Sequence, residues 1–294
     1  MHSVRRLSIL ILTLALPVAM RAQSLDTTKI DEALGRTGQK IGNVYKAGFP
    51  RIDLHVSVHG LAIKPGLALG SWAAFTGTDE NAMVMGDLVL LEDELNPVME
   101  KLRAAGFEIT AVHNHLIDET PPVIYLHYMG HGRASELAAT LRKALASSKT
   151  PLEKPAATAE EAAPPAWVKT VEDSIGRKGA YKGGVLSYGI PRKDAITMQG
   201  PVEPTAGVAE AINFQAAEMG NVATTGDFVL IASEVNPVIS ELRSHGIAVT
   251  ALHGHMLTEE PRLFFMHFWS VGNPETVGAG IDAALKKISI KLAQ

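Results

Sequence analysis

The histidines are the residues best suited to chemistry, because they recur in one pattern. His113 and His115 form a His-x-His pair, and His127 follows 12 residues later. The same spacing returns 140 residues further along the chain, in a second set: His253, His255 and His267. Two histidines on one strand and a third on its neighbour is ordinary ligand spacing for a divalent transition metal. We therefore predict a metal site in each copy, with Zn²⁺ favoured and Cu, Mn and Fe as alternatives.

Strand geometry places these rings together. Residues two apart in a strand share a face, so His113 and His115 point the same way, together with Ile109. If a hairpin closes around Thr120, His127 lies directly opposite His113, with Cβ atoms about 5 Å apart. The alternative is a core cluster of hydrogen-bonded neutral histidines. The recurrence of the triad favours a bound cation, because protonating several imidazoles in a dry site is costly.

A carboxylate follows each His-x-His pair. Glu119 and Glu259 come four residues after the second histidine, in the expected turn before a proline. Either could be a fourth ligand or a general base, or an exposed turn residue. The string from Gly106 to Glu119 resembles the first metal motif of cupins over 14 residues. A helix is expected just before it, where a cupin barrel has none, so the resemblance concerns the ligands and not the fold.

Other repeated polar residues have structural interpretations. Gly86-Asp87 and Gly226-Asp227, inside strands, predict a β-bulge, with a carboxylate supporting the ligands as the alternative. Glu94 and Glu234 are expected in solvent at the first turn of a helix.

The chain is a tandem repeat. Residues Gly86–Gly132 align without a gap onto Gly226–Gly272, with 19 of 47 positions identical. Each copy spans about 120 residues, the size of a domain. The predicted division is a signal peptide at 1–22, repeat domains at 23–146 and 166–294, and a linker at 147–165. Because the copies align residue by residue, we expect them to pack as a pseudo-dimer.

Periodicity predicts an α+β fold with a mostly antiparallel sheet in each domain. Arg51–Gly60 alternates strictly and predicts a half-buried strand. Asn96-Pro97 is typical of a helix start. From Met83 to Leu145 the expected order is strand, helix, strand, strand, helix, which is ferredoxin-like with extra strands in front. Its last helix is expected at Ala134–Leu145.

Composition restricts the class of protein. The 294 residues are 46% hydrophobic and contain no cysteine, which excludes disulfides and thiolate metal sites. The net charge of −4 and the lack of a basic run argue against nucleic acid as the partner. A positive start followed by the apolar run Leu7–Ala19 predicts a signal peptide, too short to span a membrane. The mature protein is therefore expected in the periplasm or secreted, without a membrane anchor.

The duplicated His-x-His domain with an acidic turn and a further histidine, behind a signal peptide, resembles the LppY/LpqO-like family of bacterial exported proteins. The resemblance covers nearly the whole mature chain and implies a domain of unknown function. This sequence lacks the lipobox cysteine of the lipoprotein members. Two hypotheses remain open: a metal-dependent enzyme such as a hydrolase, and a non-catalytic envelope protein that binds metal or a cell-wall ligand. An unknown small molecule or envelope component is the expected partner.

Overall fold

The structure is a computed structural model that describes residues 24–153 and 163–291. The predicted signal peptide and the central part of the predicted linker lie outside the described residues. Within the two described ranges, no helix has the length and apolar character needed to cross a membrane. The predicted α+β architecture of two similar repeats is confirmed.

Repeat 1 combines a six-stranded antiparallel sheet with three longer helices. Helix α1 begins after Asp26, whose carboxylate accepts the Thr28 N–H, and ends at Gly35 in the left-handed conformation that glycine tolerates. The elements are α1 (Thr27–Leu34), β1 (Gln39–Ile41), β2 (Val44–Pro50), β3 (Ser57–Val58), β4 (Leu61–Ala62), α2 (Pro65–Ala68), β5 (Gly70–Gly77), β6 (Ala82–Leu91), α3 (Glu92–Ala104), β7 (Glu108–His113), β8 (Glu119–Thr120), β9 (Val123–Gly132) and α4 (Ala134–Leu145).

Repeat 2 follows the same order of longer helices and strands, and it also has two short 3₁₀ turns. Its elements are α5 (Ala166–Ile175), β10 (Ala180–Lys182), β11 (Val185–Pro191), η1 (Pro204–Ala206), β12 (Ala209–Ala216), η2 (Glu218–Gly220), β13 (Val222–Leu230), α6 (Ala232–Ser244), β14 (Ala248–His253), β15 (Phe264–Gly272) and α7 (Pro274–Leu285).

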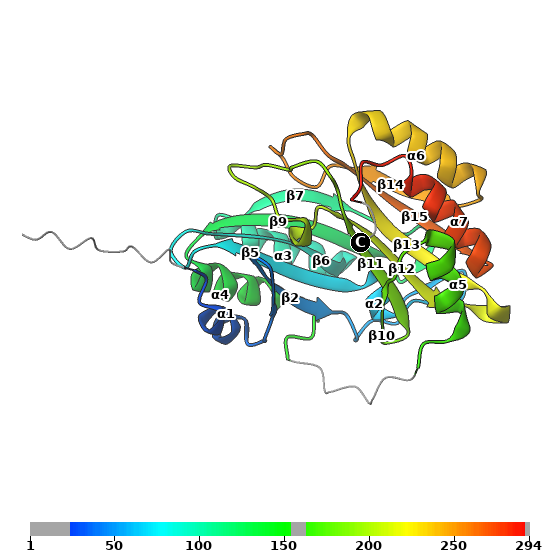
Figure 1. Cartoon of the computed structure of the whole chain (residues 1–294). Helices are drawn as coiled ribbons and strands as arrows, with labels where there is room; N and C mark the ends of the chain where they lie inside the picture. Colours follow the sequence, from blue (N-terminus) through cyan, green and yellow to red (C-terminus); the bar gives the residue numbers. More distant parts are fainter. Residues whose placement is uncertain (1–23, 154–162, 292–294) are drawn as a thin grey trace, which may run out of the picture.

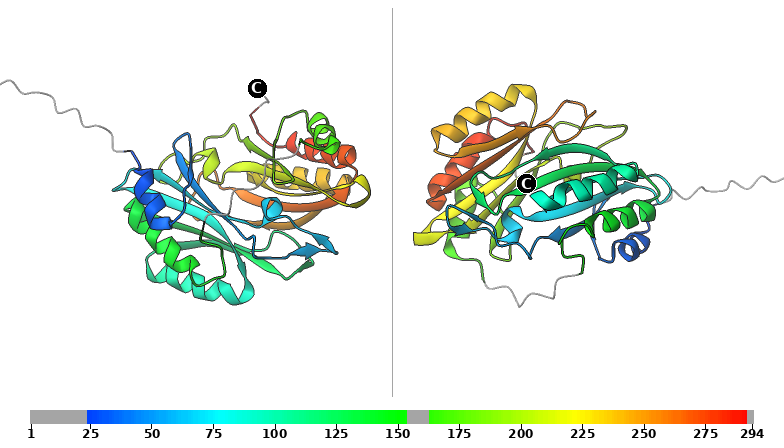
Figure 2. Two further views of the ribbon diagram at one scale, coloured as in Figure 1. Left: turned by 90° about the horizontal axis from the view of Figure 1, so that it is seen from below. Right: turned by 180° about the vertical axis from the view of Figure 1, so that it is seen from behind.

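The two sheets have the same strand order, β1-β2-β5-β6-β9-β7 and β10-β11-β12-β13-β15-β14. Helix α3 connects β6 to β7, and β9 lies between these two strands; α6 likewise connects β13 to β14, with β15 between them. This is the predicted ferredoxin-like arrangement. Helices α1, α3 and α4 lie on one outer side of the molecule, and α5, α6 and α7 lie on the other (Figures 1 and 2).

Each sheet therefore buries both faces. The helix-facing side of each sheet forms a core within its own repeat, around residues such as Phe75 and Phe268. The other sides face each other. A third core combines Met85 and Met129 of repeat 1 with Val229 and Phe265 of repeat 2. The histidines of the two triads lie in this inner layer between the sheets.

The strand predicted at Arg51–Gly60 was wrong. Only Ser57–Val58 is a strand, and the chain turns directly after Pro50. The cause is Arg51, whose side chain is fully buried and donates to Glu94 Oε2 at 2.7 Å and to Val89 O at 2.7 Å. A buried guanidinium requires a carboxylate partner, and that long-range requirement overrides the local alternation.

The expected helix start at Asn96-Pro97 was also wrong, because α3 begins at Glu92. Glu94 closes the first turn by accepting the Leu91 N–H at 2.9 Å. Glu94 and Glu234 are buried, not in solvent, and Arg192 donates to Glu234 as Arg51 does to Glu94. One carboxylate in each repeat thus caps a helix and neutralises a buried arginine.

Candidate metal centre

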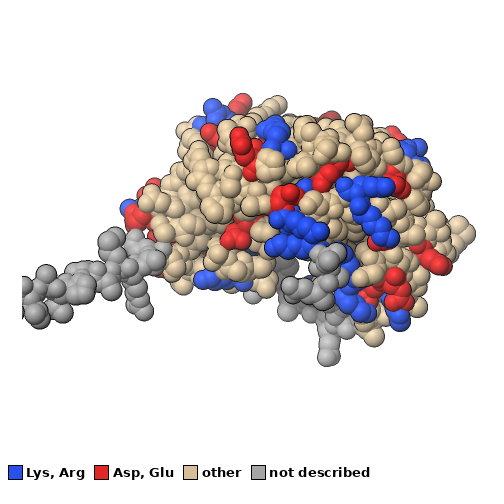
Figure 3. Space-filling view, turned by 45° about the horizontal axis from the view of Figure 1, so that its top comes forward, with Lys and Arg blue, Asp and Glu red and all other residues tan. Residues whose placement is uncertain are grey.

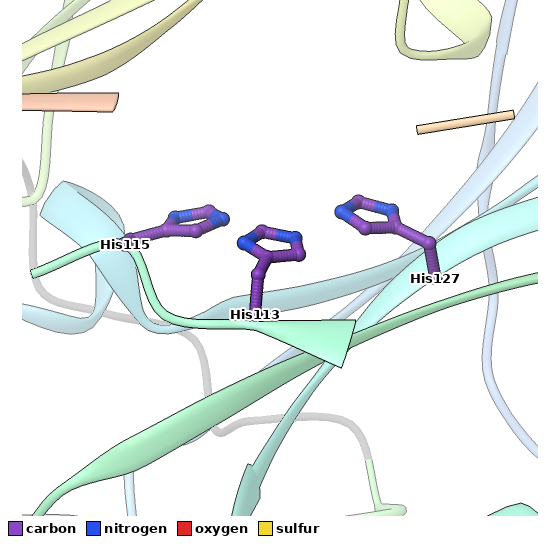
Figure 4. Close-up of side chains that lie close together, drawn as sticks. All are labelled: His113, His115 and His127. Carbon is purple, nitrogen blue, oxygen red and sulfur yellow. The ribbon is translucent and has the colours of Figure 1, made fainter. Parts of the chain in front are cut away.

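Three histidines of repeat 1 converge from the hairpin of β7 and β9. His113 ends β7, His115 follows it, and His127 lies within β9 (Figure 4). The register differs by two residues from the expected one, because Ala111 and not His113 lies opposite His127. All three rings nevertheless point to the same side and toward one another (Figure 4).

A β-bulge in β7 accounts for part of this difference. The register shifts between Ile109 and Ala111. Ile109 therefore packs on the helix side of the sheet, and not with the histidines as expected. The extra residue at the bulge aims Ala111 and His113 into the inner layer.

The histidines of both repeats form one cluster. The ring centroids of His113 and His253, which are equivalent in the two repeats, are 3.6 Å apart. His115 stacks on His267 at 3.7 Å, and His127 meets His255 edge to face at 3.5 Å. Each histidine of one triad therefore contacts one histidine of the other. The sequence predicts the two triads but contains no signal that they meet.

Backbone carbonyls set the orientation of four of the rings. The Nδ1 atoms of His113 and His253 lie 3.2 and 2.7 Å from the carbonyl oxygens of the next residue. Those of His127 and His267 lie 3.3 and 3.0 Å from Gly86 O and Gly226 O. A neutral ring that donates its Nδ1 proton to a carbonyl keeps its Nε2 lone pair free, which is the tautomer of a metal ligand.

The Nε2 atoms are the unsatisfied part of the cluster. Those of His113, His115 and His127 are buried without a hydrogen-bond partner. In repeat 2, His253 Nε2 and His267 Nε2 face each other at 2.9 Å, and only one of two neutral nitrogens can donate. Buried polar atoms without partners are costly, and a cation that accepts several lone pairs removes the cost.

Two groups of three histidines bring their ligand atoms within 4.8 Å of one another. The first is the predicted triad of repeat 1. The second is not the predicted triad of repeat 2, because His113 takes the place of His255: His113, His253 and His267. Both groups therefore depend on one imidazole from repeat 1.

The electrostatic environment keeps these rings neutral. Burial, followed by repulsion from His253, lowers the pKa of His113 to about 3. Burial also lowers the pKa of His253, and holds the pKa values of the other four well below the usual range, with neighbouring imidazoles adding to the shift. At neutral pH the cluster therefore presents uncharged nitrogen donors, the form that binds metal.

The structure does not bring Glu119 and Glu259 together with the histidines. Both lie before a cis proline in the hairpin turn. Glu119 Oε1 accepts the Val123 N–H at 3.1 Å, and Glu259 Oε1 accepts the Leu263 N–H at 3.0 Å. Burial raises the pKa of Glu119 to about 7, against the effect of the Val123 N–H. In this arrangement each carboxylate holds the turn that follows the His-x-His pair.

Asp87 lies where Glu119 was expected. It stands opposite His127 in the β6–β9 ladder, and Asp227 stands opposite His267 in repeat 2. The bulge predicted at these positions was wrong, since both ladders run without interruption. Glycine is required at position 86 for another reason, because a Cβ there would lie 2.2 Å from Trp72 O. The glycine allows β5 and β6 to approach closely.

Asp87 is 5% exposed, and its Oδ2 lies 3.8 Å from the Nε2 atoms of both His115 and His127. Burial raises the pKa of Asp87 to about 8, although Lys46 acts in the opposite direction. Burial likewise holds the pKa of Asp227 well above its usual range, and repulsion from Asp87 adds to it. Two carboxylates, one from each repeat, thus face the inner layer.

A cavity of about 590 Å³ adjoins the cluster between the sheets. Its lining includes Asp87, Asp227 and three of the histidines, His115, His127 and His255. Lys46 also lines it, with Nζ 4.1 Å from the centre of the Trp72 ring. A small molecule in this cavity would lie beside the nitrogen donors.

Sequence reasoning missed Asp87 and Asp227 as site residues. Strand alternation could have identified Asp87. Residues two apart in a strand share a face, and Met85 and Val89, on either side of Asp87, both pack in the inner layer. Lys46 and Trp72 lie on β2 and β5, which are not the strands of the histidine motif, so the motif gives no indication of them.

Comparison with known families identifies the repeated unit. A family model described as Domain of Unknown Function (DUF1259) matches the chain twice, at residues 28–147 and 169–287. The chain belongs to this family. The two DUF1259 matches correspond to the two repeats, so the protein is a duplicated domain of unknown function. No curated protein matches the chain.

One solved structure with a similarity to this DUF1259 chain is a trimeric bacterial microcompartment shell protein, PduB. The two are 12% identical over 85% of this chain and 88% of the other, with a TM-score of 0.20. A TM-score this low does not establish a shared fold.

Proposed function

We propose that this protein binds a single divalent transition-metal ion in the histidine cluster between its two repeats. The observation that supports the proposal is the convergence of buried imidazoles whose Nε2 atoms have no partner. An all-nitrogen donor set suits Zn²⁺ first, with Cu and Fe as alternatives, and is poorly suited to Mg²⁺ or Ca²⁺.

The proposed stoichiometry follows from His113. His113 belongs to both groups of three. Its Nδ1 lies 3.2 Å from Asn114 O, which leaves Nε2 as its ligand atom. One Nε2 lone pair ligates one ion. The two groups are therefore alternative positions for the same ion, and the sequence-based expectation of an independent ion in each repeat is replaced by one ion per chain.

Single substitutions test this proposal. The full chain is purified, stripped with chelator, dialysed against Zn²⁺ and analysed for bound metal. We expect about one equivalent in the wild type and none in His113→Ala, because both groups lose a ligand. The control is His131→Ala, an exposed histidine in β9 that should keep the metal. Equal metal contents in the two variants would contradict the proposal.

The adjoining cavity favours a catalytic role over a closed storage site. Because His115 and His127 line it, an ion bound to them would face a space large enough for a small molecule. Such an ion lowers the pKa of bound water and supplies a nucleophile for hydrolysis. Hydrolysis of chromogenic esters and phosphodiesters, compared in Zn²⁺ and in chelator, tests this role. A metal-loaded protein without activity would favour the non-catalytic alternative, a metal- or ligand-binding envelope protein.

We propose that this function belongs to an exported protein. The apolar run at Leu7–Ala19 and the resemblance to the LppY/LpqO-like family support the proposal of a periplasmic or secreted protein. On the face drawn in Figure 3, Lys and Arg lie interspersed with Asp and Glu. That mixture supports a small-molecule or envelope partner over nucleic acid, which requires clustered basic residues.

A further inference from the structure

Asp87 has a geometry that a hydrogen bond does not explain. Its Oδ2 is 3.8 Å from His115 Nε2 and 3.8 Å from His127 Nε2. Both distances are too long for hydrogen bonds. They suit ligands of a common ion, because atoms about 2.1 Å from one ion lie ~3.4 Å apart at the tetrahedral angle and at most ~4.2 Å apart.

The energetics of this carboxylate also call for a cation. Asp87 is buried, and its Oδ1 has no hydrogen-bond partner. Lys46 is the basic side chain among the described residues that line the cavity, and its Nζ is held against the Trp72 ring and 3.4 Å from Thr205 O. A buried carboxylate without a direct partner is costly, and a bound dication removes most of that cost.

We propose that Asp87 is a ligand of the metal ion and holds it at the group of His113, His115 and His127, on the side of His115 and His127, whose Nε2 atoms lie 3.8 Å from its Oδ2. The three histidine ligand atoms lie within 4.8 Å of one another without Asp87, so the carboxylate joins the group from its edge. This inference rests on the proposed metal-binding function and chooses between its two alternative positions. The resulting donor set is three imidazoles and one carboxylate on the cavity side. An oxygen donor of this kind favours Zn²⁺, Fe²⁺ or Mn²⁺ over Cu⁺.

The equivalent carboxylate of repeat 2 is placed differently. Asp227 Oδ1 lies 3.9 Å from His267 Nδ1, the nitrogen that already contacts Gly226 O at 3.0 Å. Asp227 therefore faces Nδ1 of that ring and not Nε2, which lies 2.9 Å from His253 Nε2. The side chain of Asp227 is also 21% exposed, against 7% for Asp87. The two repeats have diverged at the position where their histidine motifs are identical.

This difference provides a matched pair of variants, Asp87→Asn and Asp227→Asn. Each replaces one carboxyl group by an amide at the same position of its repeat and keeps the side-chain shape. Zn²⁺ affinity of the full chain is measured by competition with a chromogenic chelator. We expect Asp87→Asn to weaken binding by at least about tenfold, which metal sites lose even for partners outside the ligand shell. Asp227→Asn should leave the affinity unchanged.

Thermal unfolding gives a second readout that separates a ligand from a structural residue. In chelator, Asp87→Asn should raise the melting temperature above that of the wild type, because it removes a buried carboxyl group whose ionised form the folded state disfavours and the unfolded chain does not. In Zn²⁺ the order should reverse, because the wild type gains more from the bound ion. A variant that is less stable in both conditions would identify Asp87 as a structural residue and overturn the inference.

The choice of position is tested with His127→Ala and His267→Ala. The first should weaken Zn²⁺ binding at least as much as Asp87→Asn does, and the second should leave the affinity unchanged. Wild-type affinity in Asp87→Asn, or equal losses in the two aspartate variants, would overturn the inference while leaving the metal function intact. A wild type that binds no Zn²⁺ would instead refute the proposed function, and this inference with it.

Discussion

Replacing His113 by Phe should make the metal-free protein more resistant to acid. His113 has a pKa of about 3 in the folded state, because burial and then His253 disfavour its charged form. In the unfolded chain a histidine titrates near 6.5. Below about pH 6.5 the unfolded state therefore binds a proton that the folded state does not, and stability falls with falling pH.

The size of the effect follows from that difference. Each pH unit between the two pKa values is worth ~1.4 kcal/mol, so His113 costs the wild type about 2.7 kcal/mol at pH 4.5. Phenylalanine keeps an aromatic ring against His253 and cannot take up a proton. Comparing two proteins is necessary because Asp87, whose pKa is raised by burial, titrates in the opposite sense. The difference between variant and wild type isolates His113.

Urea unfolding in chelator at several pH values measures this difference. Above pH 7.5 the two curves of unfolding free energy against pH should run parallel, since His113 is neutral in both states. Toward pH 4.5 the wild type should lose about 2.7 kcal/mol relative to His113→Phe. Curves that stay parallel down to pH 4.5 would show that the folded protein protonates His113 freely, and would refute the buried cluster.

Three further outcomes are expected. Glu94→Gln should cost about 1.5–3 kcal/mol of unfolding free energy in urea titration, because it removes the more buried of the two carboxylates that pair with Arg51 and leaves only Asp53; a loss below about 1 kcal/mol would contradict this. Gly86→Ala should destabilise the fold by at least ~1–3 kcal/mol, because the new Cβ would lie 2.2 Å from Trp72 O and 2.5 Å from Tyr128 Oη; a melting temperature equal to that of the wild type would refute the close approach. Adding Zn²⁺ at about 100 times its dissociation constant should stabilise the wild type by ~2.7 kcal/mol, and no shift in thermal unfolding would contradict metal binding to the folded state.

Local patterns in the sequence predict much of the fold. The helix expected at Ala134–Leu145 has those bounds in the structure, and the strand expected at Met83–Leu91 is β6, one residue longer. The shared face of His113, His115 and His127 follows from the two-residue period of strands, which survives an offset of two in register. These features depend on neighbouring residues, which is why periodicity captures them.

The features that sequence missed depend on distant residues. Arg51 leaves the strand pattern because its partner Glu94 lies 43 residues away. The convergence of His113 with His253 depends on how two sheets pack face to face, which no period within either repeat encodes. The position of Asp87 beside the histidines also depends on distant residues. From the local sequence alone, a Gly-Asp pair inside a strand is typical of a bulge. Its role emerges only when β6 is paired with β9.

Anomalous diffraction from crystals grown with Zn²⁺ locates the bound ion. We expect one strong peak per chain, between the repeats and about 2.0–2.1 Å from His113 Nε2. Two separate peaks, one within each repeat, or a peak at Glu119 away from His113, would contradict it.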